Sequence, residues 1–221
     1  MEGKLYVVAT PIGNLEDITL RALRTLKEVD VMYAEDTRVI SKLLAKYEIK
    51  KPLHRLDASK ELVRVDEIVE RLQGGENIAF VSDAGTPGIS DPGARLVAGV
   101  RAAGCTIVAI PGASSLTAAL SISGVSADQF LFLGFLPHKK GRQTALKKIA
   151  LEEQPVVLFE SPHRILKLLH EVETFAAGKK VTLARELTKV FEEVLTGTPM
   201  ELREQLEKKG TARGEFVVII H

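Results

Sequence analysis

The sequence of 221 residues is poor in cysteine and in aromatic residues: it has one cysteine, Cys105, no tryptophan, and 5% aromatic residues. A chain with one cysteine cannot form an internal disulfide, which suits a reducing compartment. Cys105 adjoins an apolar run, so we expect a core residue and not a nucleophile. With so few aromatic side chains, stacking on exposed nucleic-acid bases is expected to contribute little to binding.

The sequence also lacks an excess of charge and any apolar stretch of membrane-spanning length. Its 30 basic and 29 acidic residues leave a net charge of +1, which neither demands nor excludes a nucleic-acid partner, because a basic face can lie within a neutral total. The five histidines show no metal-binding spacing, so we expect no metal site. The N-terminus has too short an apolar run for a signal peptide, and we expect a soluble, cytoplasmic protein.

The stretch 77–103 combines an apolar run, a loop rich in glycine, proline and aspartate, and a helical pattern. Ile78 to Val81 predict a buried parallel strand. Asp91 is expected to cap the following helix and Pro92 to begin it. The glycines of the loop allow close approach of a ligand to the backbone. We therefore expect a preorganised ligand loop, with an ordinary strand-to-helix turn as the alternative.

This loop does not match the familiar nucleotide-binding patterns. A phosphate-binding P-loop requires lysine and serine or threonine after its second glycine, and the sequence has Ala94 and Arg95 after Gly93. Asp83 and Asp91 would repel a polyphosphate. The reactive part of the ligand is therefore expected to be neutral or cationic.

Strand and helix patterns alternate through the first half of the chain, which predicts a parallel sheet covered on both faces. Ser59 is expected to cap one of these helices. In the second half, the segments 181–186 and 190–197 are too close for a helical crossover, so we expect an antiparallel pair and a mixed sheet. We expect two α/β domains, residues 1–113 and 114–221, with a cleft between them.

Seven short segments of the sequence together resemble one family. They are TPIGNLEDIT, AEDTR, SDAGTPGISDPG, PGASS, GFLP, ESPHR and ARELTKVFEE, in that order. The family is the tetrapyrrole methylase superfamily, and the resemblance, which runs from Leu5 to the last strand, is to those members that methylate a ribose 2′-hydroxyl of a cytidine in small-subunit ribosomal RNA. Each segment alone is weak evidence for the family. The occurrence of all seven in the same order makes the resemblance specific.

The resemblance implies the methyl donor S-adenosylmethionine in the cleft between the domains, with substrate-facing loops on the first domain, and a homodimer. Relatives that act on tetrapyrroles carry G-D-P where this chain has Gly85-Thr86-Pro87, which disfavours a tetrapyrrole substrate. Family members commonly continue into a small C-terminal region, so RNA affinity that depends on that region is expected to be missing here. The implied cofactor-binding residues are Pro11, Asp83, Ala84, Gly85, Thr86, Ile89, Ser114, Ser115, Glu160 and Glu186.

A ribose hydroxyl must lose its proton to become a good nucleophile, and a general base contributes about 10²–10⁴-fold. Asp36, Glu160, Glu186 and Lys189 each follow a strand, and we favour Asp36 and Lys189 as the catalytic residues. A lysine base requires a lowered pKa. The alternative for Asp36 is a simple ion pair with Arg38.

Cations in loops could contact RNA phosphates, and such binding falls as salt rises. For each cation, solvated surface charge is the alternative. Two other functions stay open: a methyltransferase acting on a tetrapyrrole-like small molecule, and a non-catalytic nucleotide-sensing module. The residues expected to bind RNA are Arg38, His54, Lys139, Lys140, Arg142 and Arg164.

Overall fold

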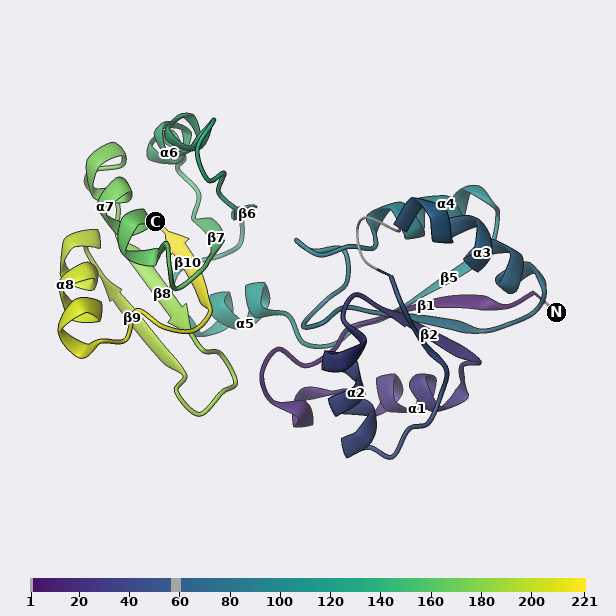
Figure 1. The fold of residues 1–221 in the computed structure, drawn as a ribbon. Helices are drawn as coiled ribbons and strands as arrows, with labels where there is room; N and C mark the ends of the chain where they lie inside the picture. Colours follow the sequence, from purple (N-terminus) through teal and green to yellow (C-terminus); the bar gives the residue numbers. More distant parts are fainter. Residues whose placement is uncertain (1, 57–60) are drawn as a thin grey trace. The chain divides into compact units, whose positions relative to one another are not determined.

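The computed structural model describes residues 2–56 and 61–221 of the chain, except for the side chains of residues 61–63. Ser59, the expected helix cap, lies outside the described residues. The chain divides into two compact units, Met1–Ser114 and Ser115–His221, each built on its own sheet (Figure 1). The expected boundary lay after residue 113. No helix in the described ranges is long and apolar enough to cross a bilayer.

The first unit contains a five-stranded sheet with the order β3-β2-β4-β1-β5. Every pairing is parallel, as the alternation of strands and helices predicted. Because all five strands point the same way, the loops that follow them leave from one edge of the sheet. The strands are β1 (Lys4–Val8), β2 (Val31–Ala34), β3 (Leu53–Arg55), β4 (Ile78–Val81) and β5 (Thr106–Ile110).

Helices cover both faces of this sheet, with α1 and α2 on one side and α3 and α4 on the other (Figure 1). Side chains of β4 alternate between the two cores: Ala79 and Val81 pack with the first helix pair, and Ile78 and Phe80 with the second. This two-sided burial explains why the strand sequence is apolar throughout. The helices are η1 (Leu15–Asp17), α1 (Leu20–Glu28), α2 (Thr37–Lys46), α3 (Glu61–Gln73) and α4 (Ala94–Ala102).

The helix after the central loop begins later than predicted. Its N-cap is Gly93, with φ +126°, and neither Asp91 as cap nor Pro92 as first helical residue is correct. A Cβ at position 93 would lie 2.5 Å from Cε1 of Phe80, so only glycine lets the chain pass over that ring. The carbonyl of Pro92 instead accepts the N–H of Gly88 at 3.1 Å, which makes the ligand loop longer than expected.

The second unit contains a mixed sheet with the order β6-β7-β10-β8-β9. β6 and β7 are parallel, and the remaining neighbours are antiparallel. The predicted antiparallel pair is β8 and β9, so the expectation of a mixed sheet is confirmed. The strands are β6 (Leu131–Phe135), β7 (Val156–Glu160), β8 (Val181–Arg185), β9 (Glu193–Gly197) and β10 (Phe216–Ile220).

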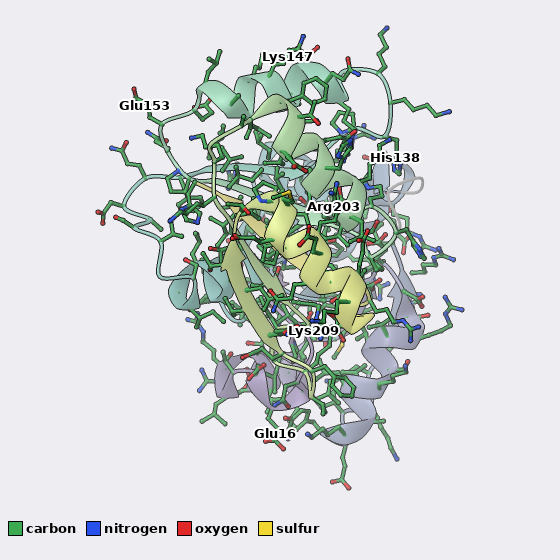
Figure 2. The ribbon with its side chains drawn as sticks, turned by 90° about the vertical axis from the view of Figure 1, so that its left-hand side faces the viewer. Glu16, His138, Lys147, Glu153, Arg203 and Lys209 are labelled. Atoms are coloured by element: carbon green, nitrogen blue, oxygen red, sulfur yellow. The ribbon has the colours of Figure 1, made fainter. Side chains whose placement is uncertain are left out.

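Three helices pack on one face of this second sheet around a core that includes Leu146, Leu168 and Leu202. Figure 2 shows α7 and α8 side by side, with Lys147 on the neighbouring α6. A capping box formed by Thr198 and Glu201 begins α8. The helices of this unit are α5 (Ser115–Ile122), α6 (Arg142–Leu151), α7 (Ile165–Phe175) and α8 (Pro199–Lys209).

Candidate functional site

Three loops at the carboxyl edge of the first sheet are locked together by hydrogen bonds. Thr10, after β1, and Gly85, after β4, exchange two backbone hydrogen bonds of 2.9 and 3.0 Å. The Thr10 hydroxyl donates to the carbonyl of Ser82 at 3.0 Å, and the Ser82 hydroxyl donates to the carbonyl of Gly85 at 2.8 Å. Thr86 donates to the carbonyl of Ala113, after β5, at 3.3 Å. The edge is therefore a preorganised surface, as a ligand site requires.

Two glycines allow these loops to lie so close. Gly85 has φ +78°, which side-chain-bearing residues rarely adopt. A Cβ at position 85 would lie 3.4 Å from Cγ2 of Ile12 and 3.8 Å from the carbonyl oxygen of Ala113. At Gly112, a Cβ would lie 3.1 Å from Cβ of Ala9. The loops can therefore pack this closely only while both positions are glycine.

The structure brings the predicted cofactor residues of the first unit onto these interlocked loops. Ile89 lies further along the central loop, with its side chain exposed. Ser115 is the first residue of α5, and Glu160 and Glu186 belong to the second unit. The binding roles of all these residues stay predictions. Those grouped at the edge of the first sheet are Pro11, Asp83, Ala84, Gly85, Thr86 and Ser114.

Acidic side chains concentrate at the same edge. Asp83 accepts the backbone N–H of Asp36 at 2.9 Å, which ties the loop after β2 to the loop after β4. Burial of Asp91, together with the charges of Glu35 and Asp83, raises the pKa of Asp91 to about 6. Sequence reasoning missed this shift because it depends on two loops meeting in space. A cluster of negative charge favours a ligand with a positively charged group.

The raised pKa of Asp91 predicts a pH-dependent stability cost. The ordinary aspartate pKa is 3.8, so the folded protein binds this proton more tightly than the unfolded chain does, and stability falls as pH rises from about 4 to about 6. Asp91→Asn is expected to stabilise the protein at pH 7 by about 1 kcal/mol, a figure reduced for partial exposure.

Denaturant unfolding of Asp91→Asn and of the original protein at neutral pH and near pH 4 measures this effect. The gain should be much smaller near pH 4, where Asp91 is protonated in the folded protein and partly protonated in the unfolded chain. Asp128→Asn, at an exposed position, is the control and should show no such gain. Equal stability of Asp91→Asn and the original protein at pH 7 would contradict the assignment.

Asp36 is the N-cap of α2. Its carboxylate accepts hydrogen bonds from the backbone and the guanidinium of Arg38, at 2.9 Å and 2.5 Å. These bonds lower the pKa of Asp36 to about 2. The ion pair that the sequence left as an alternative is therefore present, and so low a pKa makes Asp36 a weak proton acceptor.

Lys189 lies between two carboxylates, 3.0 Å from Glu186 and 2.9 Å from Glu215. Burial alone would lower the pKa of Lys189, but the hydrogen bonds to Glu215 and Glu186 outweigh it and raise the pKa. The lowered pKa that a lysine base requires is absent. Burial would raise the pKa of Glu186, but hydrogen bonds from the backbone of Glu215 and from Lys189 lower it instead.

The structure corrects the expected exposure of Arg142. This residue begins α6 and is only 3% exposed. Its guanidinium donates to Glu171 at 2.7 Å and to the carbonyl of Pro137 at 3.2 Å. An arginine buried in this way is not available to RNA phosphates. The run HKKGR looks uniformly basic, but Gly141, with φ +86°, starts the helix at the next residue and turns Arg142 inward.

The other predicted RNA-binding cations differ in accessibility. Lys139 and Lys140 are exposed. The Arg38 side chain is 88% exposed but paired with Asp36. His54 lies on β3, with its ring 5.5 Å from the ring of Tyr33. Arg164 is largely buried and donates to Glu160 at 2.6 Å. Of these side chains, the two lysines therefore fit phosphate contacts best.

The family model for tetrapyrrole (corrin/porphyrin) methylases matches residues 4–203. The chain belongs to this family. It is 48% identical to "Ribosomal RNA small subunit methyltransferase I" of Pasteurella multocida, over 100% of this chain and 79% of that protein. It is 45% identical to the protein of the same name from Thermotoga maritima, over 99% of this chain and 98% of that protein.

Solved structures with the same fold are more distant in sequence. The cobalamin biosynthetic enzyme cobalt precorrin-4 methyltransferase matches with a TM-score of 0.73 and 18% identity, over 98% of this chain and 94% of the other. Diphthine synthase matches with a TM-score of 0.77 and 16% identity, over 98% and 89% of the two chains. At such identities the likeness establishes the fold alone.

Proposed function

We propose that the protein transfers a methyl group from S-adenosylmethionine to the 2′-hydroxyl of a cytidine in small-subunit ribosomal RNA. The observation that carries this proposal is the interlocked loop cluster at the carboxyl edge of the first sheet. It occurs in a chain that shares 45–48% of its residues with proteins named for methylation of small-subunit ribosomal RNA. We also propose that the protein acts in the cytoplasm, which is consistent with an acceptor in the small ribosomal subunit.

The loop cluster fits the methyl donor. S-adenosylmethionine supplies a methyl group on a positively charged sulfur, and the acidic edge formed with Asp83 and Asp91 suits such a charge. Ala84, Gly85 and Thr86 would hold the donor, since Gly85 leaves the backbone open between Ile12 and Ala113.

In the proposed reaction, the 2′-oxygen would form a bond to the methyl carbon while the carbon–sulfur bond breaks and its electron pair stays on sulfur. The hydroxyl proton would pass to water. Holding donor and acceptor in line supplies roughly 7–11 kcal/mol of the barrier reduction. The main task of the protein is therefore alignment, which suits loops that are already locked together by hydrogen bonds.

Lys139 and Lys140, exposed between β6 and α6, are proposed to contact RNA phosphates. Replacing both by alanine is expected to raise the KM for the small subunit by about tenfold and to reduce the salt dependence of binding by a slope of about 2. Affinity for S-adenosylmethionine should not change. Kinetics at several salt concentrations, with calorimetric titration of the cofactor, measure these effects.

The matched control is alanine at both Lys147, labelled in Figure 2, and Lys148; both lysines are exposed on α6. This variant removes the same charge from the same unit and should leave the KM and the salt slope unchanged. Equal effects of the two double variants would mean that net charge, and not the loop, governs binding.

We also propose that the protein is a homodimer. The turn between β8 and β9 exposes Val190 at 94% and Phe191 at 71%, and exposed apolar groups of this kind commonly mark contact surfaces. Light scattering at micromolar concentration is expected to return the mass of two chains. The mass of one 24.1 kDa chain would contradict the proposal.

The experiment that tests the proposed function compares acceptors side by side. Labelled methyl transfer from S-adenosylmethionine is measured with small subunits lacking the modification, with free ribosomal RNA, and with a uroporphyrinogen. Label should enter the RNA of the subunits and be absent from the uroporphyrinogen. Label in the uroporphyrinogen alone would establish the tetrapyrrole alternative, and cofactor binding without transfer to any acceptor would favour a sensing module.

A further inference from the structure

Two loops of the second unit leave the sheet side by side, because β6 and β7 are parallel neighbours. The loop after β6, residues 136–141, is hereafter called the lysine loop. Two arginines bind its backbone from outside it: Arg142 donates to the carbonyl of Pro137 at 3.2 Å, and Arg164 donates to the carbonyl of Leu136 at 3.3 Å. Side chains of α6 and of the segment after β7 thus hold the start of this loop.

Both arginines are anchored on carboxylates of rigid elements. Glu160, the last residue of β7, is 2% exposed, and it accepts Nε of Arg164 at 2.6 Å and the N–H of Ser161 at 2.8 Å. Nη2 of Arg142 lies 3.6 Å from the same carboxylate. Glu171 on α7 accepts Nε of Arg142 at 2.7 Å. In each guanidinium, Nε therefore binds a carboxylate and Nη1 binds a backbone carbonyl of the lysine loop.

Stability alone is a poor explanation for this cluster. Buried ion pairs commonly contribute no more than apolar side chains of the same size would. Nη2 of Arg142, Nη2 of Arg164 and Oε2 of Glu160 make no hydrogen bond to any residue that the structure describes, which adds a desolvation penalty. The guanidinium groups donate directional hydrogen bonds to two successive backbone carbonyls. Apolar side chains could not make these bonds.

The segment that the cluster holds carries the exposed lysines. Lys139 and Lys140 lie at the tip of the lysine loop, three and four residues beyond Leu136. The N–H of Arg142 donates to the carbonyl of Lys139 at 3.2 Å, so the tip is closed by a turn. Arg142 therefore contacts the lysine loop near both of its ends, although the sequence predicted an exposed side chain at this position.

We propose that Arg142, Arg164 and Glu160 are positioning residues for RNA binding: they hold the lysine loop so that Lys139 and Lys140 meet phosphates at a fixed place. The inference rests on the proposed function, because it needs the lysines to contact RNA. It assigns an indirect role to the two arginines and to Glu160, since the described partners of these side chains are charged and backbone groups of this chain.

Arg142→Lys tests the inference with a small change. Lysine keeps a positive charge beside Glu171 but lacks the second arm that reaches Pro137. The KM for the small subunit is expected to rise by about fivefold, with kcat and cofactor affinity within twofold of the original values. Hydrogen exchange of the peptide spanning 136–142 should accelerate. Lys167→Ala, which removes another cation 3.9 Å from Glu171 without reaching the loop, is the control and should change neither quantity.

A double-mutant cycle separates positioning from a general structural effect. Alanine at Lys139 and Lys140 should raise the KM by about tenfold in the original protein, but by less than about threefold in the Arg142→Lys background, because the lysines are already misplaced there. An unchanged tenfold effect in that background would overturn the positioning role and leave the proposed function standing. No effect of the lysines in the original protein would instead overturn the RNA-binding role of the loop.

A folding defect in Arg142→Lys does not block the test. Arg164→Lys removes the equivalent arm to Leu136, and it provides the same cycle with the same two lysines. If exchange of the 136–142 peptide stays at the original rate in whichever variant folds, the arginines do not hold the loop and the inference is wrong.

Discussion

Replacing Gly85 by valine is expected to lower the affinity for S-adenosylmethionine at least about 100-fold while the protein stays folded. The position has φ +78°, where a non-glycine residue costs about 1–3 kcal/mol. A β-branched side chain would also enter the space beside Ile12 and the carbonyl of Ala113, where the cofactor is proposed to lie. Calorimetric titration measures the affinity, and circular dichroism checks the fold.

Gly104→Val is the matched control. Its φ of +77° is nearly the same, so the backbone strain is comparable, but a Cβ there has no neighbour within 4 Å. The residue lies after α4 and before β5, away from the carboxyl edge. This variant should bind the cofactor normally. Loss of binding in both variants would mean that strain, and not occupied space, is responsible.

Arg142→Met is expected to destabilise the protein by roughly 3–5 kcal/mol, because it leaves Glu160 and Glu171 buried without this partner. For a chain of this length such a loss lowers the Tm by about 10 °C. Thermal and denaturant unfolding measure the change.

The neighbouring Lys139→Met supplies the comparison, since this side chain is exposed and its loss should change stability by less than about 0.5 kcal/mol. If the two variants are equally stable, Arg142 is a surface cation after all, and the correction drawn from the structure fails.

The sequence predicted the strands of the first unit closely, because strands buried on both faces are continuous apolar runs between turn residues. The strand from Ile78 to Val81 is observed with the predicted bounds. Helix starts were less predictable. Asp91 and Pro92 are good cap residues in isolation, but the ring of Phe80 requires glycine at position 93, and that contact is not visible in the sequence.

The grouping of Thr10, Gly85 and Ala113 followed from the topology, because loops after neighbouring parallel strands meet at one edge. The charged residues were harder to interpret. Whether an arginine faces water or a carboxylate depends on residues about 20 to 30 positions away, as with Arg142 and Glu171. The proton affinities of Asp36, Asp91 and Lys189 depend in the same way on neighbours that only the fold supplies.

The most direct test of the account is the identity of the methylated nucleoside. Small subunits lacking the modification are incubated with the protein and S-adenosylmethionine, and their RNA is digested to nucleosides and analysed by mass spectrometry. The account predicts 2′-O-methylcytidine, close to one per subunit, and its absence with Gly85→Val. A methyl group on a base, or RNA that stays unmethylated while the protein binds the cofactor, would contradict it.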